Sequence, residues 1–278
     1  MITTKEFNNG IKVHAIQTGT VAVKEEHFKY SGLGILRVPK ILFGNKWMPE
    51  MPIWTWVIET PTSNYLIDTG ETVDFFSPLH FSDKGDNYVN RKILRINISR
   101  EQEIDQQLQE IGLSIEKIDV VILTHMHLDH IDGVKYFPNS RFLVSKLDWE
   151  KPYGIPLSVL PTWFKSEKID YQKSDYGFMG GFKTSNELEI IATPGYTLGH
   201  QSVMLSVDNY KIIFAGDMTF NEHQLENNIV GGINMQISKS KESIKQMQQF
   251  SRENNLIYLP SHDNESGIRL QNLTTTKC

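Results

Sequence analysis

The stretch Thr124-His125-Met126-His127-Leu128-Asp129-His130 follows directly on the apolar run Ile118-Asp119-Val120-Val121-Ile122-Leu123. A short run of this kind, rich in β-branched residues, is typical of a buried strand. Such a strand would hold three imidazoles and one carboxylate together at its carboxyl end, on a rigid element. Histidine nitrogen and carboxylate oxygen are ligands for zinc, and also for iron, manganese or cobalt. The stretch therefore predicts a metal site; a polar loop without a metal is the alternative.

Three further ligand-type residues close later strands. His200 ends the loop Thr193-Pro194-Gly195-Tyr196-Thr197-Leu198-Gly199-His200 after a predicted strand at 188–191, and Gly195 and Gly199 allow sharp turns. Asp217 follows a strand at 211–215, and His262 follows a strand at 256–260. The complete set is His125, His127, Asp129, His130, His200, Asp217 and His262. These are too many ligands for one zinc ion, so we expect two metals that share a carboxylate.

The chain has 278 residues, with 28 basic and 33 acidic side chains and a formal charge of -5. This balance gives no electrostatic case for nucleic acid or an anionic membrane, and it favours a small molecule as partner. Residues 1–7 contain no apolar signal core, and no stretch is apolar enough to span a bilayer, so we expect a cytoplasmic protein. A signal peptide removed beforehand would leave no trace in this sequence. The single cysteine, Cys278, excludes an internal disulfide and a thiolate ligand within the fold.

Strands and helices alternate along the rest of the chain. We expect strands at 11–16, 52–60, 64–67, 141–145 and 202–206, and helices at 131–136 and 240–254. A further helix begins at Ser99, where Gln102 completes a capping box, and ends at Gly112. Asp68 after the strand at 64–67 mirrors Asp217, which indicates two similar halves.

Two segments carry many large apolar side chains in an irregular pattern. Residues 18–51 predict an apolar N-terminal loop, which either packs in the core or forms a flexible wall for an apolar ligand. Residues 151–183 predict an aromatic-rich insertion, which is either a lid over the site or a dimer contact.

Three other regions are expected to be peripheral. His14 falls on the polar side of its strand and is predicted to lie on the surface. Residues 72–95 predict an inserted loop, with His80 as a loop residue. The tail after residue 270 is expected to be frayed.

The ligand pattern resembles that of the metallo-β-lactamase superfamily. The matching features are the H-x-H-x-D-H signature, the downstream His200, Gly216-Asp217 after a hairpin and His262 after a strand, and they cover residues 52–263. The resemblance implies an α/β (α+β) fold, a four-layer αββα sandwich formed by residues 1–278 as a single domain. It also implies the metal ligands: His125, His127 and His200 on one ion, Asp129, His130 and His262 on the other, and Asp217 bridging. Two zinc ions are the usual occupants, with Fe, Mn or Co as alternatives.

Within that superfamily the chain looks most like the N-acyl homoserine lactone lactonases, which are quorum-quenching enzymes. The similar features are residues 193–202, the compact length and the apolar N-terminal loop. True β-lactamases either use a cysteine ligand or lack the bridging aspartate, whereas this chain has Asp217 and no internal cysteine. The resemblance implies hydrolysis of an acyl homoserine lactone by a hydroxide that bridges two metals. Asp129 would be a ligand that also passes a proton to the leaving alkoxide; a role as ligand only is the alternative.

Phe220 departs from the family pattern, because these lactonases commonly carry a tyrosine three residues after the bridging aspartate. The developing oxyanion would then be held by a metal, by a backbone donor in the Gly231-Gly232 loop, or by a tyrosine of the 151–183 insertion; we favour the metal. The predicted substrate contacts are Phe220, Trp47, Met48 and Gly232. The alternatives are a hydrolase of other lactones, carboxylic esters or phosphotriesters on the same fold, and a metal-binding or sensing protein. A homodimer is left open.

Overall fold

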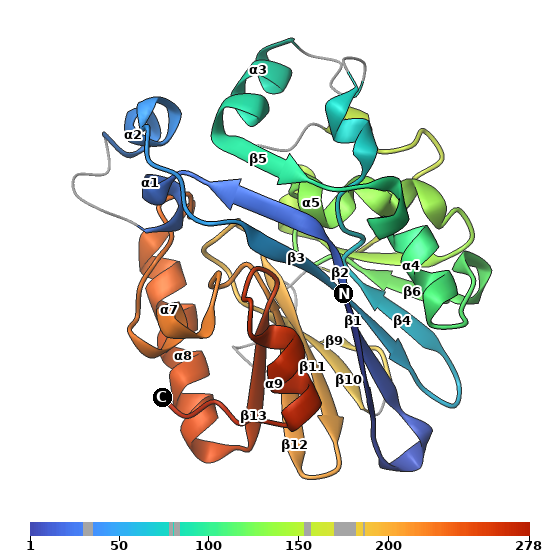
Figure 1. Ribbon diagram of the computed structural model, residues 1–278. Coiled ribbons are helices and arrows are strands. Elements are labelled where there is room, and N and C mark those ends of the chain that lie inside the picture. Colours follow the sequence, from blue (N-terminus) through green and yellow to red (C-terminus); the bar gives the residue numbers. More distant parts are fainter. Residues whose placement is uncertain (30–35, 78–79, 81–83, 153–156, 170–181, 186) are drawn as a thin grey trace.

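The computed structural model describes the whole chain except residues 30–35, 78–79, 81–83, 153–156, 170–181 and 186. The strands of the described residues form two sheets (Figure 1). The larger has eight strands, in the order β1-β2-β3-β4-β6-β7-β8 with β5 paired to β2. Their bounds are β1 Ile2–Glu6, β2 Lys12–Val23, β3 Met51–Glu59, β4 Asn64–Ile67, β5 Leu94–Asn97, β6 Val120–Ile122, β7 Arg141–Ser145 and β8 Glu167–Ile169.

The second sheet has five strands, in the order β13-β12-β11-β10-β9. Their bounds are β9 Phe182–Lys183, β10 Leu188–Ala192, β11 Gln201–Val207, β12 Tyr210–Gly216 and β13 Leu256–Pro260. β12 and β13 are parallel, as are β4, β6 and β7 in the larger sheet. Parallel strands bring their carboxyl ends to the same edge, which is where the predicted ligands stand.

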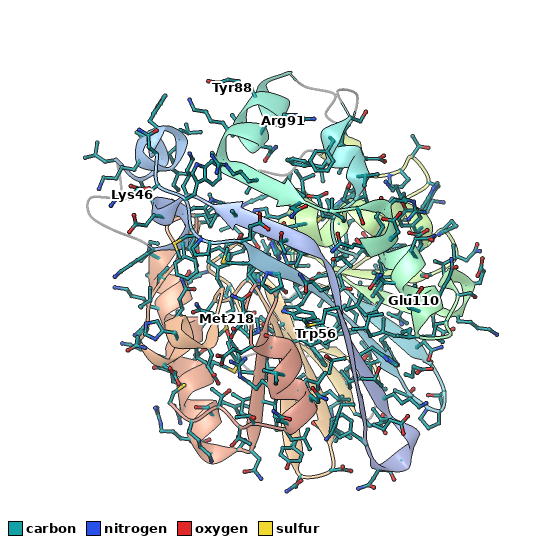
Figure 2. The ribbon with its side chains drawn as sticks, viewed as in Figure 1. Lys46, Trp56, Tyr88, Arg91, Glu110 and Met218 are labelled. Carbon is teal, nitrogen blue, oxygen red and sulfur yellow. The ribbon has the colours of Figure 1, made fainter. Side chains whose placement is uncertain are left out.

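The two sheets pack face to face because apolar side chains alternate between their surfaces. Ile212 and Phe214 of β12 lie in the core between the sheets, whereas Ile213 packs on the outer face. Trp56 of β3 lies in the same inner core, with its ring centroid 5.3 Å from that of Phe214 (Figure 2). Each sheet therefore has a second apolar face that helices must cover.

Helices cover both outer faces and complete a four-layer αββα sandwich, as the sequence predicted (Figure 1). α4 (Ile104–Glu110), α5 (Leu128–Ile131) and α6 (Lys146–Glu150) pack on the larger sheet through side chains such as Ile104 and Ile131. α7 (Glu222–Glu226) and α8 (Ile237–Glu253) pack on the second sheet, where α8 buries Ile244 and Met247. α9 (Ser266–Asn272) contacts β13 and β1.

The helix predicted from Ser99 to Gly112 is interrupted. The capping box of Ser99 and Gln102 is present and closes a 3-10 turn, η4 (Arg100–Gln102), with Ser99 N–H donating to Gln102 Oε1 at 3.0 Å. Glu103 then has an extended backbone, with φ -66° and ψ 149°, before α4 begins. The side chain of Glu103 is completely buried and accepts a hydrogen bond from Val73 N–H. Burial of this carboxylate, which the periodicity does not show, accounts for the break.

Much of the described part of segments 18–51 and 72–95 is helix or strand and not loop. β2 continues to Val23, and α1 (Glu25–Phe28) and α2 (Arg37–Phe43) follow it. The 72–95 segment contains the 3-10 turn η3 (Val73–Phe76), α3 (Lys84–Ile93) and the start of β5, which pairs with the end of β2. α2 contacts both α1 and α3, so the two segments assemble beside each other (Figure 1). The remaining 3-10 turns are η1 Asn8–Gly10, η5 Ile115–Lys117, η6 Asp132–Tyr136 and η7 Leu157–Val159.

Two predictions of exposure are wrong. His14 is buried, and its ring contacts Thr4 Oγ1 at 2.8 Å and Glu59 Oε1 at 2.9 Å, because β1 and β3 flank β2 on both sides. The tail after residue 270 is held in place, since Thr276 N–H donates to the Leu256 carbonyl at 2.7 Å and the Thr276 side chain is buried. In both cases tertiary pairing overrides a local pattern.

Candidate metal centre

The predicted ligands meet at one edge of the sandwich, each placed by the end of a strand. β6 leads into the turn that carries His125 and His127 and then into α5, which carries Asp129 and His130. The other three follow β10, β12 and β13; they are His200, Asp217 and His262. Five of the seven side chains are buried, and His127 and Asp129 are half-buried on the side that opens to solvent.

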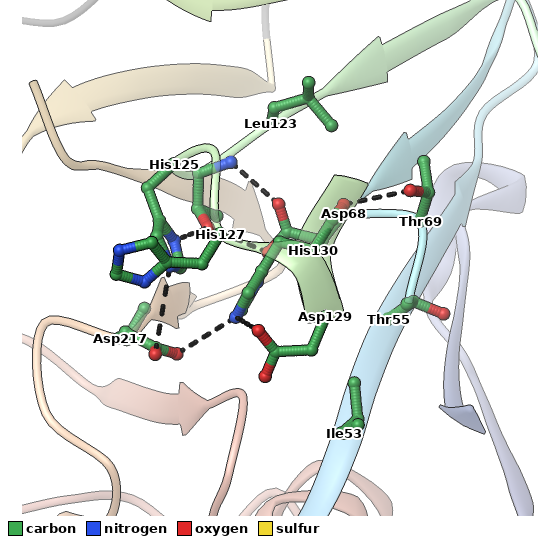
Figure 3. Close-up of polar contacts among 12 residues, drawn as sticks. Ile53, Thr55, Asp68, Thr69, Leu123, His125, His127, Asp129, His130 and Asp217 are labelled. Atoms are coloured by element: carbon green, nitrogen blue, oxygen red, sulfur yellow. Dashed lines mark hydrogen bonds and ion pairs between the residues drawn. The ribbon is translucent and has the colours of Figure 1, made fainter. Parts of the chain in front are cut away.

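Asp217 contacts several of the histidines, and Figure 3 shows its carboxylate joined to His125 and His130. Its Oδ1 is 3.4 Å from His130 Nε2 and 3.3 Å from His262 Nε2, and its Oδ2 is 3.9 Å from His125 Nε2. Asp129 lies against the same two histidines, with Oδ1 3.8 Å from His130 Nε2 and Oδ2 3.4 Å from His262 Nε2. One carboxylate thus faces two groups of imidazoles at once, which is the position a bridging ligand needs.

Several polar atoms at this centre are buried without a hydrogen-bond partner. They are His125 Nε2, His130 Nε2 and Asp217 Oδ1. Leaving such atoms unpaired costs about 1–3 kcal/mol each, so native structures rarely do so without a ligand. The ligand atoms of His125, His130 and Asp217 lie within 4.8 Å of one another, as do those of Asp129, His130 and His262. The residues therefore fit a divalent-metal site.

The far side of most of these imidazoles is held by a protein group. His130 Nδ1 donates to Asp68 Oδ2 at 2.8 Å, and His262 Nδ1 donates to the Pro52 carbonyl at 2.9 Å. His200 Nδ1 donates to the Thr193 carbonyl at 3.1 Å. These bonds orient the rings, as outer partners of metal-binding histidines do. Nε2 of His200 itself accepts a hydrogen bond from Asp217 N–H at 3.0 Å.

Asp68 holds both ends of the ligand motif at residues 124–130. Its carboxylate also accepts bonds from Thr124 N–H and Thr124 Oγ1, both at 2.8 Å, so it fixes the start of the ligand motif as well as His130. Its backbone has φ 58°, which directs the chain away from β4 at this point. The sequence marked Asp68 as a strand-end residue but did not show this contact.

Three residues of the cluster, His125, His200 and Asp217, have protonation states that suit metal ligands. Burial lowers the pKa of His125 well below its usual value and that of His200 to about 3, so both rings are neutral. Burial disfavours the charged form of Asp217, but the nearby His262 and His130 outweigh it and hold the pKa of this carboxyl well below its ordinary range. Neutral imidazoles and an ionised carboxylate are the forms that coordinate metals. Burial disfavours the charged forms of His130 and His262, but Asp68 beside His130 and Asp217 beside both rings outweigh it and raise the pKa of each.

The loop that carries His200 is packed tightly against two other elements. Gly195 has φ 137°, and a Cβ there would lie 2.4 Å from Ser240 N at the start of α8. A Cβ on Gly199 would lie 2.2 Å from Ser145 Oγ and 2.7 Å from Asp148 N. Asp148 accepts hydrogen bonds from Thr197 Oγ1 and Gly199 N–H, both at 2.7 Å. The two glycines are therefore required by close approach, which agrees with the turns that the sequence predicted.

Tyr196 stands in the same loop, and sequence reasoning did not assign it a role. Its hydroxyl lies 3.2 Å from Nδ1 of His127, and its ring packs edge-on against His125 with the centroids 5.0 Å apart. Burial, followed by the nearby Asp217 and Asp129, raises the pKa of this phenol well above its ordinary value, so it stays protonated. A neutral phenol at a metal centre is a hydrogen-bond donor. Its place between two glycines, four residues before His200, was the signal in the sequence.

A cavity of about 380 Å³ opens on the exposed side of the cluster. Most of its lining is apolar and comes from the end of β2, from α1 to α3, and from the segments that follow β6, β10, β12 and β13. The lining residues are Val21, Val23, His27, Val38, Ile41, Leu42, Met51, Val89, Asn90, Ile93, Leu94, His127, Leu128, Asp129, Tyr196, Phe220, Ile233 and His262. The ligand wall predicted for residues 18–51 is thus built from strand and helix rather than from loop.

The four predicted substrate contacts separate into two groups. Phe220 lines the cavity, stacked on Phe28 at 5.6 Å and with its ring 5.6 Å from that of His262. Trp47, Met48 and Gly232 are not among the lining residues that the structure describes. Lys24 covers the ring of Trp47 at 3.7 Å, and Met48 packs in a neighbouring core cluster.

Gly232 packs against α1 instead of the cavity. Its N–H donates to the His27 carbonyl at 2.8 Å, and a Cβ at this position would overlap the Glu26 carbonyl oxygen. Because its N–H is already engaged, Gly232 does not offer the backbone donor considered for an oxyanion.

The aromatic-rich segment 151–183 is described only in part. Trp163 and Phe164 pack on Phe142 of β7, with ring centroids 6.3 Å and 4.9 Å away, on the outer face of the larger sheet. None of the described residues of this segment lines the cavity. The predicted lid or dimer contact at 153–156 and 170–181 lies outside the described residues. No helix within the described ranges is long and apolar enough to cross a membrane.

The fold and the ligand cluster together define a metal-binding αββα sandwich protein. Residues 48–262 match the family model of the metallo-beta-lactamase superfamily. The chain belongs to this superfamily.

Similar proteins share the fold at low sequence identity. N-acyl homoserine lactonase AttM of Agrobacterium fabrum is 21% identical over 266 residues, which cover 91% of this chain and 93% of AttM. A solved structure of an N-acyl homoserine lactone hydrolase, with the product N-hexanoyl-L-homoserine bound at its catalytic metal centre, superposes with a TM-score of 0.73 at 17% identity and covers 91% of this chain and 93% of that one. AidC, described as a dizinc quorum-quenching lactonase, gives a TM-score of 0.67 at 17% identity, with 96% and 92% covered.

Proposed function

We propose that this protein is a dinuclear zinc hydrolase that opens the lactone ring of N-acyl homoserine lactones and so quenches quorum-sensing signals. One observation carries the proposal: a largely apolar cavity opens directly on the candidate ligands, five of which form two groups with their ligand atoms within 4.8 Å of one another. A substrate that has a polar head, which reacts at a metal centre, and an apolar tail would fit this combination of cavity and ligands. The similarity to lactonases supports the same substrate class.

The ligand sets would be those implied by the family. His125, His127 and His200 would hold one ion, Asp129, His130 and His262 the other, and Asp217 would bridge them. When bound, two such ions lower the pKa of water towards about 7 and polarise a carbonyl, which supplies the nucleophile and part of the charge stabilisation. Iron, manganese and cobalt accept the same donor set.

Tyr196 provides the phenol that Phe220 does not. Its ring stands edge-on to Phe220, with centroids 5.8 Å apart, so the hydroxyl approaches the centre from the neighbouring loop. We assign Tyr196 Oη as the hydrogen-bond donor to the substrate carbonyl oxygen, whose negative charge grows as the ring opens. This replaces the expectation that a metal alone, or a tyrosine of the 151–183 insertion, holds the oxyanion.

Asp129 would transfer the proton during ring opening. It is the half-buried carboxylate that lines the cavity, whereas Asp217 is enclosed by histidines. Its carboxylate would receive a proton from the attacking water and deliver it to the alcohol that leaves the ring. Phe220 and the side chains of β2 and α2 would enclose the acyl tail.

A substrate panel tests the proposal. Metal-loaded protein would be assayed with homoserine lactones of short and long acyl chains, an unacylated lactone, an aryl ester and a phosphotriester, with Asp217→Ala as the inactive control. We expect turnover to be fastest on acyl homoserine lactones. Faster turnover of the ester or the phosphotriester would reassign the substrate class, and no turnover on any of them would favour a metal sensor.

Three further expectations remain proposals of the same kind. We propose that the chain folds as one domain, because the inner core contains residues of both sheets. A cytoplasmic location and the oligomeric state are also open to direct measurement, by fractionation and by light scattering.

A further inference from the structure

A second buried cluster of ligand-type side chains lies next to the metal centre. It consists of Glu71, His80 and Asp132, whose ligand atoms lie within 4.8 Å of one another. Glu71 follows the turn after β4, Asp132 follows directly on α5, and His80 follows η3. None of the three belongs to the seven-ligand set. His80, expected to be a loop residue, has a side chain that is only 7% exposed.

Glu71 is the poorly compensated carboxylate of this cluster, whereas Asp132 Oδ2 accepts a hydrogen bond from the Thr72 hydroxyl. Glu71 is completely buried, and the Asp132 side chain is 2% exposed. Glu71 Oε1 accepts a bond from the N–H of Thr72, but Oε2 is buried and has no hydrogen-bond partner. Burial, and next the neighbouring Asp132, raises the pKa of Glu71 well above its ordinary value. A positive charge beside Glu71 Oε2 would therefore stabilise the ionised form of this carboxylate.

The nearby protein groups leave this need unmet. The ammonium group of Lys135 is engaged with Thr72 Oγ1 at 3.0 Å and with Asp74 Oδ2 at 2.5 Å. His80 Nε2 lies 3.3 Å from Asp132 Oδ1, and burial lowers the pKa of His80, so its ring is neutral and offers a lone pair. A neutral imidazole and two carboxylates form a three-ligand set of the kind that binds Zn²⁺ or Mn²⁺, with water completing the shell.

We propose that Glu71, His80 and Asp132 form a third cation site, selective for a divalent transition metal and structural in role. Residues 69–72 and 130–133 already run side by side, since Thr69 N–H donates to the His130 carbonyl at 2.8 Å and Gly133 N–H to the Gly70 carbonyl at 3.4 Å. A cation between Glu71 and Asp132 clamps these two segments together. Because Asp68 directly precedes the first segment and His130 begins the second, the clamp also supports the bond between these two residues.

Metal counting tests this site separately from hydrolysis. Chelator-treated protein would be titrated with Zn²⁺ alone, freed of excess metal by gel filtration and measured by elemental analysis. We expect Glu71→Gln and His80→Ala to bind one ion fewer per chain than the wild type. Glu110→Gln, which changes an exposed glutamate at the end of α4, is the matched control and should bind the wild-type number.

The main alternative is a proton shared by Glu71 and Asp132 instead of a metal. In that case Glu71→Gln and the wild type bind equal numbers of ions, and the proposal is overturned.

A second measurement guards against a folding defect in a variant. Zn²⁺ should raise the Tm of the wild type more than that of Glu71→Gln, while in chelator Glu71→Gln should be at least as stable, because it lacks a buried charge. An equal Zn²⁺-induced rise would also overturn the proposal. Metal content and the Zn²⁺-induced change in Tm do not depend on lactonase activity. A failure of the proposed function in the substrate panel would therefore not affect this test.

Discussion

The hydroxyl of Tyr196 lies 3.2 Å from Nδ1 of His127, although the two residues are 69 positions apart. His127 is thereby distinguished from His130, His200 and His262, whose Nδ1 atoms are turned away from the centre towards protein partners. The loop at 193–200 and the ligand motif at 124–130 meet at this contact, which places a phenol beside the metal centre.

Replacing Tyr196 by Phe tests the role of that phenol. Removal of one oxyanion donor should lower kcat by about 10²–10³-fold. Bound metal should stay at the wild-type amount, because Tyr196 is not among the proposed ligands. Tyr210→Phe, on β12, serves as the matched control and should retain activity. If kcat of Tyr196→Phe stays within about threefold of the wild-type value, the metal alone holds the oxyanion.

Phe220 is expected to act as a wall and not as a catalytic group. Its ring contacts those of Phe28 and Tyr196, and it has no polar atom to offer to the substrate. Phe220→Leu should therefore raise KM while kcat stays within about tenfold, the pattern of lost uniform binding. Steady-state kinetics with one acyl lactone measure both constants. A large fall in kcat with unchanged KM would contradict this assignment.

Asp217 is expected to matter most for metal content. Asp217→Ala should lose at least one ion per chain, because its carboxylate faces both groups of histidines. His14→Ala and His223→Ala are controls that should keep the wild-type content. His14 is bound to Thr4 and Glu59 far from the centre, so its loss should lower the Tm only. Elemental analysis showing equal losses in all three variants would remove the assignment of Asp217.

Acyl-chain length should affect binding through the apolar cavity. Each methylene that becomes buried contributes about 0.8 kcal/mol, or about fourfold in affinity. Longer-chain lactones should therefore bind more tightly until the cavity is filled, and Ile41→Ala should weaken this dependence, since Ile41 is buried and lines the cavity. The inhibition constants of the ring-opened products give a direct measure. A flat dependence on chain length would show that the cavity does not hold the tail.

Asp148 should make stability depend on pH. Burial raises its pKa to about 6 from the ordinary value of 3.8, although the bonds from Thr197 and Gly199 oppose the shift. A raised folded-state pKa means that its contribution to stability is complete below pH of about 4 and is lost as the pH rises through about 6.

Asp148→Asn isolates that contribution, because the amide keeps the shape and can still bond both partners. In urea unfolding between pH 4 and 7, the free energy of unfolding of the wild type should fall relative to that of the variant as pH rises. Parallel pH profiles for the two proteins would refute the assignment of this titration to Asp148.

The sequence by itself predicted the candidate ligands and determined the layered fold, because both depend on local patterns. Apolar runs that end in His or Asp mark strands whose carboxyl ends carry ligands, and this holds for 118–130, Asp217 and His262 alike. The alternation that separates Ile212 and Phe214 from Ile213 is likewise visible in the sequence, and it predicts sheets with two apolar faces.

Only the tertiary structure decided which side chains share a pocket. Tyr196 reaches His127, Glu71 reaches Asp132, and β1 buries His14, through contacts between segments that no periodicity connects. Trp47 and Phe220 both appeared to suit an apolar ligand, yet only Phe220 faces the cavity, because Lys24 covers the indole ring. Local sequence sets the type and direction of an element, whereas the neighbours of a side chain are set by long-range packing, where a single register or crossing determines what it touches.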